Sequence, residues 1–128
     1  MKITLCGSIS FAKEILEIRD KLAAIHHEVF VPQSIIEYSI RSSEEADELK
    51  ADREKYISEI KPYYTRAHFN LIEKSDAILV VNLEKNGIKN YIGGATFAEI
   101  MVALYLKKKI FQTYRAYYYT LMFRLPLI

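Results

Sequence analysis

The glutamate at position 99 stands out because its surroundings in the sequence give it no partner. It ends the run 90–99, NYIGGATFAE, and the apolar segment that follows extends to residue 106. A carboxylate buried in an apolar helix needs a hydrogen bond or an opposite charge. The residues one helical turn away carry no cation: Ala95, Thr96, Val102 and Ala103. Glu99 is therefore a candidate functional group; the alternative is a glutamate that caps its own helix or pairs with a distant arginine.

Two adjacent glycines, Gly93 and Gly94, precede this glutamate. Glycine lets a backbone turn sharply and approach a ligand closely, because it adopts left-handed conformations without a steric cost. Amide groups at the start of the following helix would then point at the ligand. We predict a glycine turn beside the site, with left-handed backbone at the glycines.

Further candidate groups follow two predicted strands. Gly7 and Ser8 break the apolar run 2–6, and a strand followed by Gly-Ser and a helix is one way in which α/β proteins hold phosphate. This signal is weak alone, since any strand-to-helix turn favours these residues. Asn82 ends the run 77–81 in the same way. Cys6, at the end of the first run, is interpreted as a buried core thiol.

Histidines offer a second kind of candidate. His68 shares a helical face with Tyr64, Leu71 and Ile72, so it belongs among core-facing residues. Such a histidine is either a hydrogen-bonded core residue or a catalytic one. His26 and His27 lack further ligands at productive spacing, and we predict surface positions for them and no metal site.

Composition excludes several classes of protein. The chain has 128 residues, 51% of them hydrophobic and 27% charged, as expected for one globular domain over residues 1–128. A net charge of +2 without a basic stripe argues against nucleic acid. One cysteine excludes an internal disulfide, no apolar run reaches membrane-spanning length, and the chain starts without a signal peptide. We predict a cytoplasmic protein without a cofactor or a membrane partner.

The elements that must position these residues alternate between strand and helix. Strands are predicted at residues 2–6, 29–31, 75–82 and 110–111. Helices are predicted at about residues 11–22, within the charged segment 37–61, from Pro62 to residue 75 and, as an apolar and buried helix, after Gly94. This order predicts an α/β fold: a doubly wound, flavodoxin- or Rossmann-like three-layer sandwich around a parallel sheet of 4–5 strands. Ligands of such folds bind at the carboxyl ends of the strands. The candidates after the first and third strands should meet there.

Two segments fit this pattern less well. Ser42 and Glu45 have the spacing of a capping box and open a charged helix with a thin apolar stripe, which could lie over the site as a flap. The tail 112–128 is crowded with tyrosine and phenylalanine and contains no acid. We predict that this tail is buried in a homodimer or a higher homo-oligomer.

Together, these motifs resemble the nucleoside 2-deoxyribosyltransferase superfamily, which includes 2′-deoxynucleoside 5′-phosphate N-hydrolases. The resemblance covers about residues 1–111. It rests on the segments CGSI (6–9), SDAILVVN (75–82) and GGATFAE (93–99). It implies that Glu99 is the nucleophile and that His68 is a second catalytic residue. It also implies a substrate site formed by residues from all three segments: Cys6, Gly7, Ser8, Ile9, Asn82, Gly93 and Gly94.

The sequence departs from the family pattern at two positions. Hydrolase relatives carry an arginine after Gly-Ser-Ile, where this chain has Ser10; Lys13, one turn further on, could replace its charge. Relatives also place an aspartate near the position of His68. The missing arginine leaves open whether the substrate carries a phosphate.

The resemblance implies cleavage or transfer of the N-glycosidic bond of a 2′-deoxynucleoside or its 5′-monophosphate. Glu99 would attack C1′ and form a glycosyl ester, which water or a second base then resolves. One alternative is a nucleotide sensor that kept the pocket without turnover. Another is an enzyme that cleaves NAD or a nucleotide sugar with the same glutamate, and the 2′-hydroxyl of the substrate separates it from the first.

Overall fold

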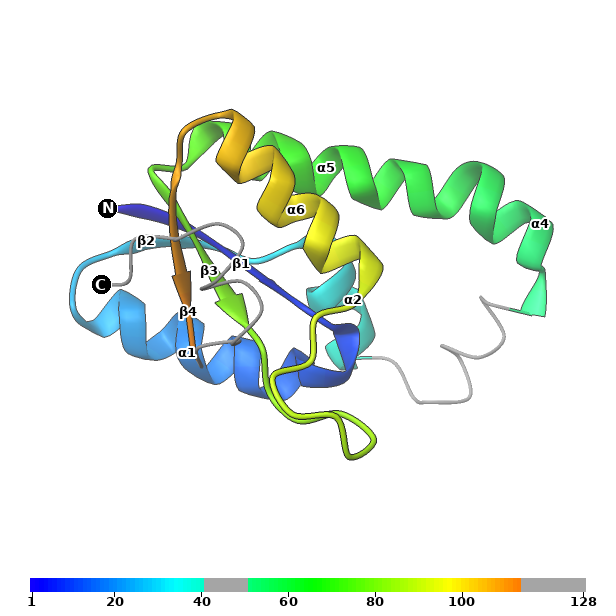
Figure 1. The fold of residues 1–128 in the computed structure, drawn as a ribbon, viewed down its shortest axis with the longest axis horizontal. Helices are drawn as coiled ribbons and strands as arrows, with labels where there is room; N and C mark the ends of the chain where they lie inside the picture. The colour runs from blue at the N-terminus through cyan, green and yellow to red at the C-terminus, as the bar shows by residue number, and fades with distance from the viewer. Residues whose placement is uncertain (41–50, 114–128) are drawn as a thin grey trace.

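A computed structural model of the chain describes residues 1–40 and 51–113 (Figure 1). Its strands are β1 (Lys2–Gly7), β2 (Glu28–Phe30), β3 (Ala77–Val81) and β4 (Lys109–Gln112). The helices are the 3₁₀ turn η1 (Ile9–Phe11), α1 (Ala12–Ala24), α2 (Gln33–Ile40), α4 (Arg53–Lys55), the π turn η2 (Tyr56–Ile60), α5 (Lys61–Lys74) and α6 (Gly94–Tyr105).

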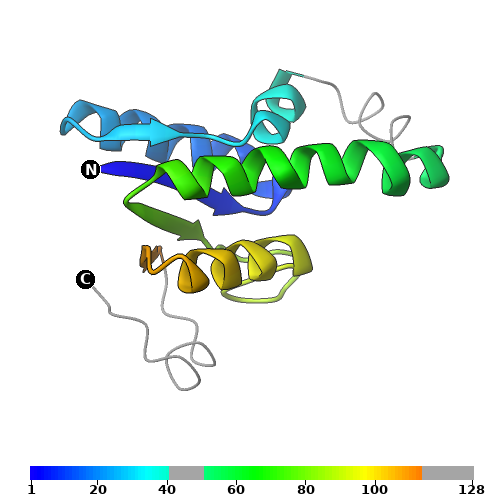
Figure 2. The same ribbon diagram turned by 90° about the horizontal axis from the view of Figure 1, so that it is seen from above.

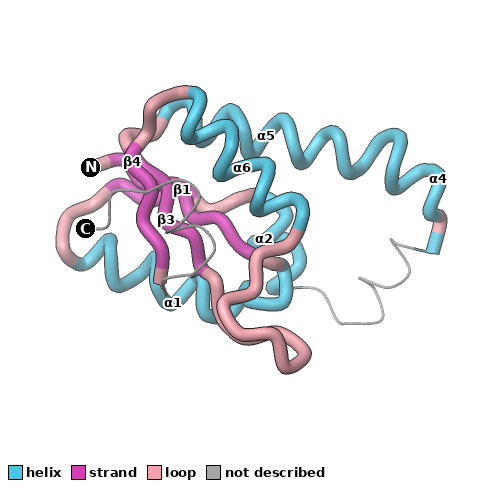
Figure 3. The backbone as a smooth tube through the Cα atoms, in the orientation of Figure 1, coloured by secondary structure: helices cyan, strands magenta, loops and turns pink. Residues whose placement is uncertain are grey.

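The four strands form one parallel sheet in the order β2-β1-β3-β4, which is seen as the magenta strands of Figure 3. From β1 the chain moves one way to β2 and then crosses back over β1 to β3 and β4. The direction of winding therefore reverses between β1 and β3, the place where doubly wound sheets bind ligands. The predicted α/β fold with a parallel sheet is confirmed.

Alternation along the strands divides the core into two layers. Cys6, Ile78 and Val80 face one side, where they pack with Ile72 of α5 and Ile100 of α6. Ile3, Leu5, Ala77 and Val81 face the other side and pack with Phe11, Ile15 of α1 and Ile35 of α2. Figure 1 shows α5 and α6 on one side of the strands and α1 on the other, and in Figure 2, which looks onto the sheet from above, α5 lies over the strands. Because side chains alternate along a strand, the thiol of Cys6 in β1 faces the side of the sheet that α5 and α6 cover.

The connection between β2 and β3 differs from the sequence prediction in two ways. Helix α2 follows Pro32 directly, where no helix was predicted. Pro62 does not begin a separate segment, because α4, η2 and α5 follow one another without a break from Arg53 to Lys74 (Figure 1). A proline in a helix lacks an N–H and its ring crowds the preceding turn. We attribute the wider π turn just before Pro62 to the missing N–H and the crowding ring of this proline.

Helix α6 is buried on only one side, which corrects the prediction of a helix buried all round. Thr96, Glu99, Ile100 and Ala103 are buried, at the helical spacing of a single face. The opposite side exposes large apolar residues: Phe97, Leu104 and Tyr105. The helix lies on an outer layer of the sandwich, so only the stripe toward the sheet and α5 is covered.

Three further predictions concern the chain as a whole. None of the helices in the described ranges has the length and apolar character needed to cross a bilayer. The capping box at Ser42 and Glu45 lies outside the described residues. The same is true of the aromatic tail beyond Thr113, so its predicted burial between subunits stays a prediction.

Candidate active site

The end of β1 brings the first part of the site into position. Gly7 pairs with Val81 of β3, and a side chain at Gly7 would place its first carbon 2.9 Å from the Val81 carbonyl oxygen and 3.2 Å from Cδ1 of Ile15. Glycine is required here by this close approach of β3 and α1. After Gly7, Ser8 begins η1, and its Oγ accepts a hydrogen bond from the Ser10 N–H at 3.3 Å.

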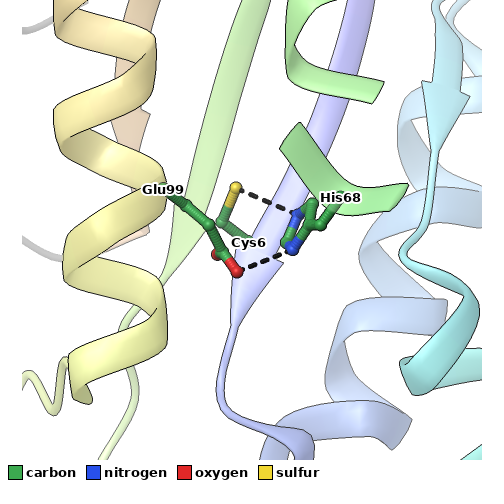
Figure 4. Close-up of side chains that lie close together, drawn as sticks. All are labelled: Cys6, His68 and Glu99. Carbon is green, nitrogen blue, oxygen red and sulfur yellow. Dashed lines mark hydrogen bonds and ion pairs between the residues drawn. The ribbon is translucent and has the colours of Figure 1, made fainter. Parts of the chain in front are cut away.

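Three side chains from three elements meet beneath this turn: Cys6 of β1, His68 of α5 and Glu99 of α6 (Figure 4). His68 Nδ1 lies 2.6 Å from Glu99 Oε1, and His68 Nε2 lies 3.5 Å from Cys6 Sγ and 3.2 Å from the Leu5 carbonyl oxygen. Cys6 is fully buried, and the exposed fractions of His68 and Glu99 are only 7% and 8%. The imidazole thus bridges the strand and the carboxylate.

The short contact between Nδ1 and Oε1 requires a proton between these two acceptor-capable atoms. If Nε2 donates to the Leu5 carbonyl, the ring nitrogens both carry protons when Glu99 is ionised. If the Cys6 thiol instead donates to Nε2, the ring is neutral and Nδ1 donates to the carboxylate. In both arrangements His68 holds one oxygen of Glu99, and both of its ring nitrogens are engaged within the cluster.

The second carboxylate oxygen, Glu99 Oε2, is closed off from solvent and has no hydrogen-bond partner among the described residues. The Glu99 side chain as a whole is 10% exposed. The terminal torsion of a glutamate is broad and two-fold, so a half-turn of the carboxylate exchanges its two oxygens. A buried oxygen left unsatisfied within residues 1–40 and 51–113 is uncommon and therefore marks a candidate functional group.

The Cys6 thiol is unreactive in this arrangement. Burial raises the pKa of the Cys6 thiol well above its usual value, and the negative charge of the nearby Glu99 carboxylate raises it further. The thiol is therefore protonated near neutral pH, and it is a donor to the cluster and not a nucleophile.

The cluster also offers three atoms of metal-ligand type, all within 4.8 Å of one another. Its hydrogen bonds show how they are used: Nδ1 of His68 faces Glu99, whereas Nε2 faces Cys6 (Figure 4). One ring nitrogen would have to approach both other ligands to share a single ion with them. The arrangement fits a hydrogen-bonded relay better than a metal centre, although a turned ring would bring a ligand set together.

A cleft of about 410 Å³ opens above Glu99 at the carboxyl ends of β1 and β3. Most residues predicted for the site line it; they come from the first and third sequence motifs and from α5: Gly7, Ser8, Ile9, His68, Gly93, Gly94 and Glu99. Cys6 lies below the cleft and touches it through His68. Asn82 is fully buried outside the lining, where its Oδ1 accepts a hydrogen bond from Thr113 Oγ1 at 3.0 Å.

The two glycines take part in the cleft for a different reason from the one predicted. Neither has positive φ, so the expected left-handed turn at Gly93-Gly94 is wrong; the left-handed residues of this loop are Asn86, Gly87 and Asn90. Gly93 is the N-cap of α6. A side chain at Gly94 would meet nothing within 4 Å, so its absence leaves room in the cleft.

Sequence reasoning missed much of the cleft wall. Four tyrosines line it: Tyr38, Tyr56, Tyr64 and Tyr91. The cations among its described lining residues are Lys61 and Lys85, whereas Lys13, expected to supply a charge, is exposed and lies outside the lining. The clearest available signal was the position of Lys85, four residues after the end of β3, in the loop that leads to the glycines.

Comparison with known proteins leaves the geometry as the main source of information. No protein-family model matches the chain, and no curated protein sequence matches it.

Proposed function

We propose that the protein cleaves or transfers the N-glycosidic bond of a 2′-deoxynucleoside or its 5′-monophosphate. The proposal includes membership of the nucleoside 2-deoxyribosyltransferase superfamily, which the motifs around Cys6, Ser75 and Gly93 resemble. One observation supports it most: Glu99 lines the cleft with Oε1 held by His68, and Oε2 has no hydrogen-bond partner among the described residues.

The reaction uses the carboxylate as a nucleophile. An oxygen of Glu99 attacks C1′ of the deoxyribosyl group while the bond from C1′ to the base nitrogen breaks and its electron pair leaves with the base. The transition state carries positive charge on the sugar, which a carboxylate below the ring stabilises. Water then adds its oxygen to C1′ and releases Glu99, giving hydrolysis, or the nitrogen of a second base does so, giving transfer.

His68 acts through Glu99 in this scheme. Both ring nitrogens are engaged, by Glu99 on one side and by Cys6 or Leu5 on the other. The imidazole therefore orients the carboxylate, and the proton taken up by the leaving base comes from another source. This makes His68 a positioning residue.

The cleft walls suit the rest of such a substrate. Tyrosines on opposite elements offer apolar faces for a base, and Lys61 and Lys85 favour an anionic ligand. We also propose a homodimer or higher oligomer, which the exposed Phe97, Leu104 and Tyr105 of α6 support, and a cytoplasmic location, which the single cysteine supports.

Base release from a panel of substrates tests the proposal. Deoxynucleosides, their 5′-monophosphates, the matching ribonucleotides and NAD are incubated with the protein, and free base is measured by chromatography. The Glu99→Gln variant keeps the side-chain shape and removes the nucleophile, so base release should fall by several orders of magnitude. Glu73→Gln, an exposed glutamate of α5, is the matched control and should keep full activity. Unchanged base release by Glu99→Gln would exclude the covalent mechanism.

A second candidate function is a nucleotide-binding module without turnover. It is favoured by the paired Oε1 and the closed-off Oε2, since an oxygen must turn toward the cleft before it can attack. Tight binding of a nucleotide with no base released by the wild-type protein, and no glycosyl adduct in its intact mass, would support this module over the enzyme.

A further inference from the structure

The cluster of Cys6, His68 and Glu99 brings three different metal ligands together: a thiol, an imidazole and a carboxylate (Figure 4). Their ligand atoms lie within 4.8 Å of one another, and within residues 1–40 and 51–113 this is the one group of three or more such side chains that could share an ion. Thiolate and imidazole are the ligands that zinc prefers, and zinc also accepts carboxylate oxygen. The cluster therefore has the composition of a transition-metal site, although in the free protein its hydrogen bonds are those of a relay.

The proton shared by His68 and Glu99 marks the place where an ion fits. Nδ1 and Oε1 lie 2.6 Å apart, and both are capable of binding a metal. Zinc bonds to nitrogen and oxygen are about 2.0–2.2 Å long, so two such ligands at a tetrahedral angle lie about 3.3–3.5 Å apart. An opening of the contact by less than about 1 Å would admit Zn²⁺ in place of the proton.

The other ring nitrogen of His68 is already placed as a metal-bound histidine requires. Histidine ligands donate the N–H of the second nitrogen to a carboxylate, a backbone carbonyl or water, which fixes the tautomer and the orientation of the ring. His68 Nε2 lies 3.2 Å from the carbonyl oxygen of Leu5 in β1. With Nδ1 on the ion, Nε2 carries the ring proton and donates it to this carbonyl.

The Cys6 sulfur completes the ligand set by a small movement. Sγ lies 3.5 Å from His68 Nε2 and within 4.8 Å of the other ligand atoms. Around a tetrahedral zinc ion, sulfur lies about 3.5–3.6 Å from a nitrogen or oxygen ligand, so a gap of about 1.3 Å at most must close. Small turns of the thiol and of the imidazole close it. The fourth position is left for Glu99 Oε2, which has no hydrogen-bond partner among the described residues, or for a donor in the cleft.

Charge balance favours a divalent ion at this depth. All three side chains are buried, and a buried charge is costly unless an opposite charge compensates it. A thiolate, a carboxylate and a neutral imidazole together carry two negative charges, which Zn²⁺ cancels. Mg²⁺ and Ca²⁺ require a shell of oxygen ligands and water, which sulfur and imidazole do not supply. The cluster is thus suited to zinc over the hard divalent cations.

We propose that Cys6, His68 and Glu99 bind one Zn²⁺ ion, which enters through the cleft that His68 and Glu99 line and displaces protons of the relay. The thiol proton leaves to solvent and the ring keeps one proton on Nε2. If the ring is doubly protonated beforehand, a second proton leaves. The binding itself does not depend on the proposed reaction. Because the ion occupies a carboxylate oxygen of Glu99, zinc would inhibit the enzyme proposed above.

Cobalt titration of the reduced, chelator-treated protein tests the inference, since Co²⁺ takes the same ligands and is coloured. One equivalent of Co²⁺ should give the thiolate charge-transfer band in the near ultraviolet and the intense visible bands of a tetrahedral ion, and one equivalent of Zn²⁺ should remove both. A hundred equivalents of Mg²⁺ should remove neither. One equivalent of Zn²⁺ should also raise the Tm of the wild-type protein, because it binds the folded state.

Two ligand variants and one control locate the ion. Cys6→Ala should abolish the charge-transfer band and lower the affinity for zinc by at least about 100-fold, and Glu99→Gln, which keeps the side-chain shape, should keep the band and lower the affinity by at least about 10-fold. The control removes a different pair of nitrogen donors: the Met1 amino group lies 3.0 Å from His27 Nδ1. His27→Gln should leave the spectrum, the affinity and the rise in Tm unchanged.

Three results would overturn the inference. They are a cobalt spectrum without the thiolate band, a zinc affinity that neither Cys6→Ala nor Glu99→Gln changes, and loss of binding in His27→Gln. Glu99→Gln decides the matter if Cys6→Ala fails to fold.

These measurements separate the metal site from the proposed function. A thiolate band in the cobalt spectrum, with no base released by the metal-free protein, would contradict the enzyme and leave the zinc site standing. Base release that continues unchanged in excess zinc, with no thiolate band, would contradict the zinc site and leave the enzyme standing.

Discussion

Replacing His68 with phenylalanine should expose how strongly the fold depends on the contact with Glu99. The substitution removes the partner of Oε1, and Oε2 already lacks one among the described residues. A buried carboxylate without any hydrogen bond costs about 3–5 kcal/mol if it remains charged. It can instead take up a proton. An ordinary glutamate loses its proton near pH 4.3, so keeping it at pH 7 costs about 2.7 × 1.36, or about 3.7 kcal/mol.

The cost should therefore depend on pH in a specific direction. In His68→Phe the folded state keeps a proton on Glu99 that the unfolded state gives up above about pH 4.3, so the variant loses stability as the pH rises. At pH 5 the same protonation costs only about 1 kcal/mol. We expect the loss of unfolding free energy to be about 3–4 kcal/mol at pH 7 and about 2–3 kcal/mol smaller at pH 5.

Urea denaturation at pH 5, 6 and 7 measures this dependence. Adding Glu99→Gln to His68→Phe removes the unpaired charge, so the double variant should be more stable than His68→Phe at pH 7, by about 2 kcal/mol, and insensitive to pH. Glu73→Gln in the same background is the control and should restore nothing. A pH-independent cost for His68→Phe, together with a further loss from Glu99→Gln, would refute the pairing of these two side chains.

Two further predictions concern the glycines and the cysteine. Gly7→Ala should lower the unfolding free energy by about 1–3 kcal/mol, because its new carbon meets the Val81 carbonyl oxygen. Gly94→Val should change the unfolding free energy by less than about 0.5 kcal/mol and should weaken ligand binding, because the new side chain enters the cleft. Thermal unfolding and ligand titration measure the two effects, and a larger loss of stability for Gly94→Val than for Gly7→Ala would contradict the cleft geometry. Cys6, the single cysteine, should resist thiol reagents in the native protein and react on unfolding. Because its pKa is raised in the folded state, its contribution to stability should decline as the pH rises above about 8.5, by up to about 1.4 kcal/mol per pH unit, and Cys6→Ala should lack this decline in urea titrations.

The fold could be predicted from local signals because the strands of a parallel sheet carry distinctive ones. The run 77–81 is apolar throughout and suits a strand covered on both faces, and the alternation of such runs with helical periods defines an α/β order. The helix of residues 33–40 was missed because its apolar residues lie close together and follow a proline, which usually ends an element.

The site was predictable only in part. Glu99 could be singled out from the sequence, because helical spacing decides which residues are its neighbours and none of them was a cation. That it would meet His68 at 2.6 Å could not be deduced, since the contact joins α5 and α6. The alternatives for Glu99, a helix cap or a distant arginine, differ from the observed partner only in tertiary arrangement.

Three features could therefore be predicted from the sequence alone: the order of the elements, the candidate groups at the strand ends and the functional importance of Glu99. Each of them depends on residues that lie close together along the chain. Tertiary structure decided which candidates share a site. The winding of the sheet brought Ser8 and Lys85, 77 positions apart, within hydrogen-bond distance, and turned Asn82 toward Thr113 outside the cleft. It also decided that Gly94 provides space where a left-handed turn was expected, because the positive φ angles lie at Asn86, Gly87 and Asn90 instead. Such contacts depend on the packing of whole elements, which no local pattern records.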